Sequence, residues 1–130
     1  MRPRSHQPGC VFCTMAEGHV TEENPFVYSV RDTSPVTPLH TLILPKCHVA
    51  SYFDLEAKEK GAIDGLLEHS RRGILALDPS VKGFNIGINV GEVAGQTIFH
   101  CHVHLIPRRL GDVANPRGGV RAVIPGKASY

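Results

Sequence analysis

The sequence predicts an α+β domain, because segments with the two-residue period of strands surround one long segment with the period of a helix. The helical face is formed by apolar residues spaced three, four or seven positions apart, namely Ile63, Leu66, Leu67, Ile74 and Leu77. The strand-like segments are residues 26–30, 40–45, 83–90 and 96–107, and residues 120–124 offer a further short strand. We therefore expect four or five strands and one helix.

Local signals predict where these elements begin and end. Asp, Ser and Pro in residues 31–35 predict a turn after the first strand. Asp54 is a candidate cap for the helix, and Asp78-Pro79 ends it. Its charged residues are expected on a solvated face: Glu56, Lys58, Glu59, Lys60, Glu68, Arg71 and Arg72. Residues 83–90 alternate apolar with polar positions, and residues 91–95 predict a tight connection into an antiparallel hairpin.

The composition limits the class of protein. The chain has 130 residues, 42% hydrophobic and 20% charged, so we expect one globular domain over residues 1–130. A net charge of +2 is too small for a protein that coats nucleic acid or a membrane surface. No apolar run reaches the ~18 residues that span a bilayer, and the first residues are polar, so a cytoplasmic location is expected. Residues 1–9 are predicted to form a mobile arm.

Four cysteines are candidate metal ligands or core thiols: Cys10, Cys13, Cys47 and Cys101. A reducing compartment disfavours structural disulfides. Cys10 and Cys13 are spaced to chelate one Zn²⁺, but two ligands are half of a structural site. A zinc site and a pair of buried or redox-active thiols both fit this motif. His48 could return through a loop to the cysteine pair, or it could be a surface or helix-capping histidine.

The most informative feature is three histidines at alternate positions of residues 96–107, namely His100, His102 and His104. The strand period predicts that all three imidazoles lie on one face. With a rise of about 3.3 Å per residue, neighbouring histidines on that face have Cα atoms roughly 6.6 Å apart. One small substrate or ion can therefore contact two of them.

Three kinds of site fit such a face: metal ligands, a covalent catalytic set, and a binding surface without turnover. The second is favoured, because imidazole with a pKa of ~6.5 is a free nucleophile at neutral pH and phosphoimidazole is a good leaving group. The strand carries no carboxylate that would complete a hydrolytic metal centre. Gln96 and Asn89 are neutral polar groups suited to phosphate oxygens. Three unpaired buried imidazoles would cost several kcal/mol, which disfavours a purely structural role.

The pattern around these histidines resembles the signature of the histidine triad superfamily of nucleotide hydrolases and transferases. It reads Asn89-x-Gly91-x-x-Ala94-Gly95-Gln96-x-x-x-His100-x-His102-x-His104-Leu105-Ile106. Upstream, Asp32-x-Ser34-Pro35-x-x-Pro38-x-His40 and Leu44-Pro45-Lys46-x-His48 are similar to the family's nucleoside pocket. The resemblance implies an antiparallel sheet of about five strands with the long helix packed on one face, usually in a homodimer.

The resemblance also implies residue roles. His102 would be the nucleophile that takes the α-phosphate, His104 would hydrogen-bond the phosphate and the scissile oxygen, and His100 completes the catalytic motif. Nucleotide contacts are expected from Asp32 to the ribose hydroxyls, from Asn89 to the sugar-phosphate side, from Gln96 and Thr97 to phosphate oxygens, and from His40.

Family members with an N-terminal Cys-x-x-Cys pair use two histidines as further zinc ligands. The resemblance therefore implies a closed structural zinc site made of Cys10, Cys13, His48 and His100. Under this hypothesis His100 is a ligand rather than a direct catalyst, and no organic cofactor is expected. Cys47 and Cys101 are left as packed thiols.

The substrate implied by the resemblance is a nucleotide with a purine base. Similar proteins hydrolyse dinucleoside polyphosphates or nucleoside phosphoramidates, and others transfer nucleotides. The phosphoramidase branch ends in a Trp-Pro-Pro-Gly segment, and this chain has no tryptophan. Its tail, residues 108–130, instead carries arginines and glycines that suit a longer polyphosphate. The sequence therefore favours diadenosine polyphosphates as substrates, with diadenosine tetraphosphate as the example.

Overall fold

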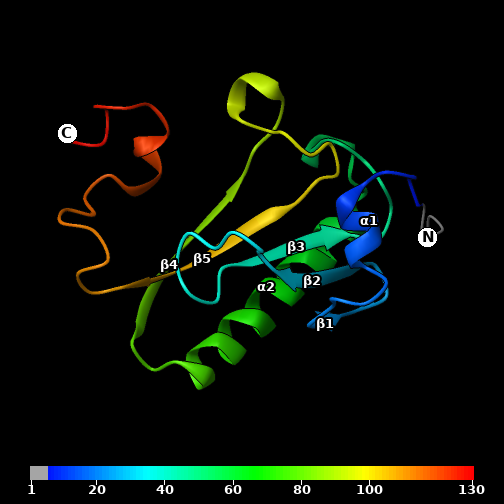
Figure 1. The fold of residues 1–130 in the computed structure, drawn as a ribbon, viewed down its shortest axis with the longest axis horizontal. Helices are drawn as coiled ribbons and strands as arrows, with labels where there is room; N and C mark the ends of the chain where they lie inside the picture. The colour runs from blue at the N-terminus through cyan, green and yellow to red at the C-terminus, as the bar shows by residue number, and fades with distance from the viewer. Residues whose placement is uncertain (1–5) are drawn as a thin grey trace.

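The computed structural model describes residues 6–130 and shows one sheet with one long helix (Figure 1). The helices and strands in chain order are α1 (Val11–Met15), β1 (Glu22–Glu23), β2 (Val27–Arg31), β3 (Thr41–Pro45), α2 (Ala57–Leu77), β4 (Val81–Ile88) and β5 (Val103–Arg109). The five strands pair antiparallel in the order β1-β2-β3-β5-β4. The predicted α+β class, with five antiparallel strands and one long helix, is confirmed.

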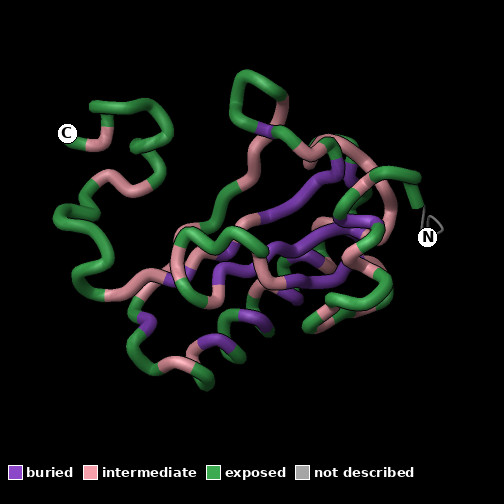
Figure 2. The backbone as a smooth tube through the Cα atoms, in the orientation of Figure 1, coloured by how far each residue is buried: buried purple, intermediate pink, exposed green. Residues whose placement is uncertain are grey.

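One face of the sheet carries the main hydrophobic core, beneath α2. Strand residues Val27, Ile43 and Val103 are buried together with Ile63 and Leu66 of the helix. Removing an aliphatic side chain of this size from water stabilises the fold by about 1.5–3 kcal/mol. Figure 2 shows that burial is concentrated in the central strands and on one side of α2, whereas the C-terminal segment is largely exposed.

The opposite face of the sheet is covered in part by the short helix α1. Tyr28, Leu42 and Leu44 point to this side and pack with Phe12 of α1. The hydroxyl of Tyr28 donates a hydrogen bond to the carbonyl oxygen of Phe12, at 2.9 Å. Because α1 has only five residues, much of this face is left for a binding site.

The register of β5 decides which histidine faces which side. Ile43 pairs with Val103 and Leu42 pairs with His104. Since successive residues of a strand point to opposite faces, Val103 enters the core and His104 lies on the α1 side. The predicted strand over residues 96–107 is wrong for residues 96–102, which form a loop before β5.

The connection between β4 and β5 is longer than predicted. Instead of a tight turn over residues 91–95, residues 89–102 join the strands, with Gly91 and Gly95 in left-handed conformations at φ 92° and 94°. The Gln96 side chain holds this loop, because its oxygen accepts from the Gly91 N–H and its nitrogen donates to the carbonyls of Ala50 and Ile98. These hydrogen bonds satisfy backbone groups that would otherwise pair between the two strands of a hairpin.

Three strand expectations need correction. Residues 120–124 are not a strand, since Gly119–Val123 form a 3₁₀ helix. The two-residue β1 was too short to recognise from its sequence. In β4 the expected core position Ile86 is 53% exposed, because β4 is an edge strand of the sheet.

The start and end of α2 also differ from expectation. The cap is Glu56 rather than Asp54, which lies in a 3₁₀ turn, Tyr52–Asp54. Glu59 is buried rather than solvated, because its carboxylate accepts a hydrogen bond from the Glu56 N–H at 2.8 Å in a capping box. At the other end Leu77 is 68% exposed, so the buried stripe ends before the last turn.

The N-terminal arm is described only in part. Residues 1–5 of the predicted arm lie outside the described residues. The backbone N–H of Gln7 donates to the Cys13 thiol sulfur at 3.4 Å, so the end of the arm contacts the domain. Among the described residues no helix has the length and apolar character needed to cross a membrane.

Candidate active site and metal site

A cavity of about 500 Å³ lies on the α1 side of the sheet and has the histidines at its base. His102 and His104 line it, together with Asp32 after β2 and Asn89 after β4. Its apolar wall comes from α1 and β3 and consists of Val11, Phe12, Met15 and Leu42. An apolar wall facing polar groups is the arrangement expected of a small-molecule site.

His102 is held in one orientation by a backbone hydrogen bond. Its Nδ1 lies 2.8 Å from the carbonyl oxygen of His100, and a carbonyl can only accept, so Nδ1 carries the proton. The other ring nitrogen, Nε2, is therefore left with a lone pair when the imidazole is neutral. His102 is 9% exposed, and its ring packs against Phe12 at a centroid distance of 4.8 Å. The ring of His102 is therefore held in one orientation at the cavity.

His104 is set as a hydrogen-bond donor by a chain of contacts behind it. The backbone N–H of Val36 donates to Nδ1 of His40, so neutral His40 carries its proton on Nε2. That Nε2 lies 2.9 Å from Nδ1 of His104 and donates to it. His104 consequently carries its own proton on Nε2. The two neighbouring catalytic candidates therefore present opposite functions, a lone pair on His102 and an N–H on His104.

Burial keeps His104 neutral. It lowers the pKa of His104 to about 4, with further lowering from neighbouring His102 and His40 and a smaller opposing effect of Asp32. Burial also lowers the pKa of His40, partly offset by Asp32. The chain of neutral tautomers is thus stable through the neutral pH range.

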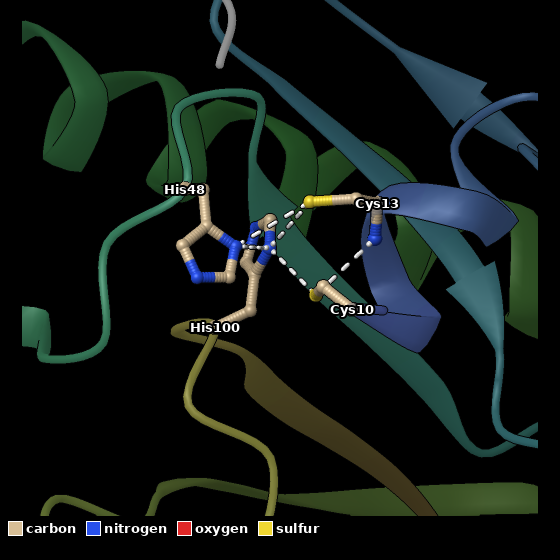
Figure 3. Close-up of side chains that lie close together, drawn as sticks. All are labelled: Cys10, Cys13, His48 and His100. Atoms are coloured by element: carbon tan, nitrogen blue, oxygen red, sulfur yellow. Dashed lines mark hydrogen bonds between the residues drawn. The ribbon is translucent and has the colours of Figure 1, made fainter. Parts of the chain in front are cut away.

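A second cluster lies beside the cavity and contains the predicted metal ligands. The ligand atoms of Cys10, Cys13, His48 and His100 all lie within 4.8 Å of one another (Figure 3). Nδ1 of His100 is 3.6 Å from the Cys10 sulfur and 3.5 Å from the Cys13 sulfur. Nδ1 of His48 is 3.4 Å from the Cys13 sulfur and 3.1 Å from Nδ1 of His100.

These distances fit a tetrahedral metal ion. With metal–sulfur bonds of about 2.3 Å and metal–nitrogen bonds of about 2.05 Å, tetrahedral geometry requires S···N separations of about 3.5 Å and an N···N separation of about 3.3 Å. Nε2 of His100 donates to the Pro45 carbonyl at 2.9 Å, so the lone pair of the neutral ring lies on Nδ1, among the other ligand atoms. The four predicted residues are therefore positioned to bind a metal, and the alternative of a surface His48 is wrong.

The comparisons with known proteins agree with this geometry. The family profile of the HIT domain matches residues 14–111 of the chain. The chain belongs to the HIT family. Adenosine 5'-monophosphoramidase HNT1 of Candida albicans is 31% identical over 108 residues, covering 77% of this chain and 70% of that protein. Adenylylsulfatase HINT3 of Arabidopsis thaliana is 32% identical over 110 residues, covering 82% of this chain and 55% of that protein.

A solved structure supports both the fold and the metal site of this HIT domain. It is the Zn-bound histidine triad family protein from Mycobacterium smegmatis, with a TM-score of 0.73 and 32% identity, and the match covers 82% of this chain and 80% of that one. The superfamily expected from the sequence is thus shown. Two of these relatives carry the names of hydrolases, a monophosphoramidase and an adenylylsulfatase.

The histidines do not all share one face, contrary to the strand period. His104 lies in β5, but His100 and His102 precede that strand, in the loop. The chain bends there, so the His100 ring joins the cysteines while the His102 ring faces the cavity. His100 is accordingly placed as a metal ligand and lies outside the residues that line the cavity.

The predicted nucleotide contacts divide into two groups. Asp32, Asn89, Thr97 and His104 line the cavity. Gln96 is 3% exposed with its amide bound to backbone groups, and His40 is 2% exposed behind His104, so neither lines it. Their direct contacts with a nucleotide stay predictions.

Sequence reasoning missed the contribution of α1 to the cavity. Val11, Phe12 and Met15 form its wall although the helix is too short to show a period. The one available signal was the position of Phe12 between the two cysteines. A metal site that fixes the cysteines must also fix the aromatic ring between them.

Two cysteines lie outside the metal cluster, Cys47 and Cys101. Cys101 is buried, and burial raises its pKa to about 11, with smaller effects of Asp54 and Glu59. It is therefore a protonated, unreactive thiol at neutral pH. Cys47 is partly buried, and no function follows from its position.

The Asp32, His40 and His104 group also has ligand atoms within 4.8 Å of one another. Its tautomers argue against a metal ion there. His40 accepts the Val36 N–H at Nδ1, so Nε2 needs its proton and cannot act as a ligand without forming an imidazolate. The group is better described as a hydrogen-bonding network that orients His104.

The lowered pKa of His104 predicts a specific loss of stability at acidic pH. The unfolded chain binds a proton with a pKa of about 6.5 and the folded protein with a pKa of about 4, so the free energy of unfolding decreases as pH falls between these values. The contribution is at most roughly 3 kcal/mol. Urea denaturation of wild type and His104→Gln at pH 7 and pH 4.5 measures it.

In that experiment, lowering the pH from 7 to 4.5 should decrease the free energy of unfolding of wild type more than that of His104→Gln. His19→Gln, at an exposed histidine, serves as the control and should follow wild type. Parallel pH profiles for wild type and His104→Gln would contradict the low pKa of His104.

Proposed function

We propose that this HIT domain hydrolyses nucleotides at the α-phosphate through a covalent nucleotidyl-His102 intermediate. The observation that carries the proposal is the pairing of opposite hydrogen-bonding states at the cavity. His102 presents a lone pair on Nε2, and His104 presents an N–H on Nε2, at a ring-centroid distance of 5.1 Å. A nucleophile beside a donor is what a two-step phosphoryl transfer requires.

The reaction proceeds in two balanced steps. In the first, Nε2 of His102 attacks the α-phosphorus, a P–N bond forms, and the bond from phosphorus to the leaving group breaks with its electron pair. His104 donates a hydrogen bond to the oxygen on which negative charge develops. In the second step water attacks the phosphorus, the P–N bond breaks with its electron pair returning to Nε2 of His102, and the proton that water loses passes to the departed leaving group. The products are the nucleoside monophosphate and the protonated leaving group.

The rest of the cavity suits the nucleoside. The Asp32 carboxylate lines the cavity, and its Oδ1 accepts the Ser34 N–H at 2.8 Å, so its position is held by the turn. We propose that this carboxylate binds the ribose hydroxyls, because its oxygens can accept hydrogen bonds from both hydroxyls of the diol. The wall of Phe12, Met15 and Leu42 suits a planar purine. Asn89 and Thr97 are placed to donate to phosphate oxygens.

Three leaving groups remain candidates. The basic tail is the reason that the sequence favours diadenosine polyphosphates, but Arg108 and Arg109 are paired with Asp112 and Asp78 and do not line the cavity. The names of the relatives HNT1 and HINT3 support an adenylyl group on nitrogen or on sulfate. All of these substrates share the adenosine 5'-phosphoryl unit, which is the part that the cavity residues bind.

A competition experiment separates these substrates. The purified protein receives diadenosine tetraphosphate and adenosine phosphoramidate together, and the products are resolved by chromatography. We expect AMP together with ATP, because attack at an α-phosphate of the tetraphosphate releases the triphosphate half. His102→Ala run in parallel should give no product, which excludes a contaminating enzyme.

Loss of the phosphoramidate alone would make the protein a phosphoramidase and would contradict the preference for a polyphosphate. Turnover of neither compound, with adenosine phosphosulfate also intact, would contradict hydrolysis as the function.

We propose zinc as the occupant of the metal site. Two thiolates and two imidazoles at tetrahedral separations are the usual donors of structural zinc, and a closed set of four protein ligands leaves no position for substrate. When bound, zinc would hold α1 and the loop before β5 together. It would take no part in the phosphoryl transfer.

Elemental analysis of the purified protein should find about one zinc per chain. Cys10→Ser should lose both the metal and thermal stability, because the binding free energy of a structural site is also folding free energy. Cys47→Ser, which lies outside the cluster, is the matched control and should retain both. Zinc-free wild-type protein of full stability would contradict the assignment.

We further propose a homodimer in the cytoplasm. Within the described part of the chain β4 is an edge strand of the sheet, and Ile86 on it is half exposed, as is expected where a second copy adds a strand. Reduced thiolates at the metal site require a reducing compartment. The small net charge supports a nucleotide, rather than a nucleic acid or a membrane surface, as the partner.

A further inference from the structure

The metal site and the catalytic cavity share one residue, His100, through two different groups. Its imidazole Nδ1 lies among the metal ligands, within 3.6 Å of both cysteine sulfurs. Its backbone carbonyl accepts the hydrogen bond from Nδ1 of His102, at 2.8 Å. We propose that metal binding at His100 positions the nucleophile and selects the tautomer of His102. This inference rests on the proposed function of His102.

Two side-chain anchors of His100 act together with a backbone hydrogen bond, in which the Cys101 N–H of the same peptide unit donates to the Val49 carbonyl at 2.6 Å. The first anchor is the metal, and the second is the hydrogen bond from Nε2 to the Pro45 carbonyl at the end of β3, at 2.9 Å. Without the metal the ring keeps this hydrogen bond and its contacts with the Cys10 and Cys13 sulfurs and with Nδ1 of His48, but no ion fixes their separations. Because residues 96–102 lie in a loop, no strand ladder holds this carbonyl in place. The metal would therefore add, through the imidazole, to the single backbone hydrogen bond of Cys101 in orienting this carbonyl.

A second contact links the same two sites through Phe12. Its position between Cys10 and Cys13 places it on the helix that the metal holds, and it is 5% exposed. Its ring packs against His102 at a centroid distance of 4.8 Å and against His100 edge-on at 6.2 Å. The imidazole of His102 is thus held on one side by a carbonyl and on another by an aromatic ring, and the metal cluster fixes both.

The other catalytic histidine is anchored independently of the metal. His104 pairs with Leu42 within the sheet, and its tautomer follows from His40 and the Val36 N–H. None of these residues belongs to the metal cluster. Metal loss should therefore disturb His102 and spare His104. A general loss of folding would disturb both, so the two outcomes can be distinguished.

The test measures ring tautomers directly, without a substrate. Long-range ¹H–¹⁵N correlation spectra distinguish a protonated from an unprotonated imidazole nitrogen, and spectra are compared for the zinc-loaded protein and for the protein after chelator treatment. We expect His102 with the proton on Nδ1 in the loaded protein and averaged signals after zinc removal. The His104 signals should stay unchanged.

Kinetics on whichever nucleotide is turned over provide the second readout. Loss of a group that orients a catalytic side chain costs about 10- to 100-fold in activity. We expect that decrease in kcat after zinc removal, with a smaller change in KM, because Asp32 and Leu42 line the cavity, lie outside the metal cluster and still bind the nucleotide.

The variant Phe12→Leu removes the aromatic contact while keeping all four ligands. It should retain one zinc per chain and lower kcat, with His102 signals shifted toward those of the zinc-free protein. Phe53→Leu, at an aromatic residue that is 76% exposed, is the matched control and should behave as wild type.

Unchanged His102 signals in a folded zinc-free protein would overturn the proposal, as would wild-type kcat in Phe12→Leu. If no nucleotide is hydrolysed by any form, the proposed function fails, and the tautomer spectra still decide whether the metal positions His102. Circular dichroism establishes that each form is folded.

Discussion

The hydrogen bond from Nδ1 of His102 to the backbone carbonyl of His100 is the interaction on which the candidate chemistry depends. It determines which nitrogen of His102 keeps a lone pair and where that lone pair points. A histidine free to exchange tautomers would present its nucleophilic nitrogen only part of the time. The His100 imidazole among the metal ligands and the ring of Phe12 each contribute to holding one of the two partners of this bond.

The sheet explains why the bond can form at this place. β3 and β5 pair in the centre of the sheet, with the helix α2 on one face and α1 with the cavity on the other. The α2 face is apolar and supplies stability, so the α1 face is free to carry histidines and a carboxylate. His104 uses the regular strand for its orientation. His102 and His100 lie before the strand, where side-chain and metal contacts must replace ladder hydrogen bonds.

The same arrangement shows how much of the molecule was predictable. The alternation of Val103 with His104 placed His104 opposite the core correctly, since a strand period needs no tertiary information. It failed at His100, because the Gln96 side chain captures backbone groups of the preceding loop and the strand begins three residues after His100. The spacing of apolar residues cannot show that a side chain competes with strand hydrogen bonds for the same backbone groups.

Contacts between distant segments were the other limit. The cysteine pair indicated half a metal site, and the superfamily resemblance supplied His48 and His100, which the structure places beside it. Nothing in the sequence indicated that Val36 would fix the tautomer of His40, because the donor is a backbone N–H. Glu59 likewise had the appearance of a surface residue until its capping hydrogen bond was seen.

The most direct measurement is a search for the covalent intermediate. The protein is mixed rapidly with its nucleotide substrate, unfolded within the first turnover under conditions that preserve phosphoimidazole, and analysed by mass spectrometry. We predict one AMP group per chain, carried by the peptide that contains His102, and no such adduct in His102→Ala. Product formation without an adduct, or an adduct on another residue, would contradict His102 as the nucleophile.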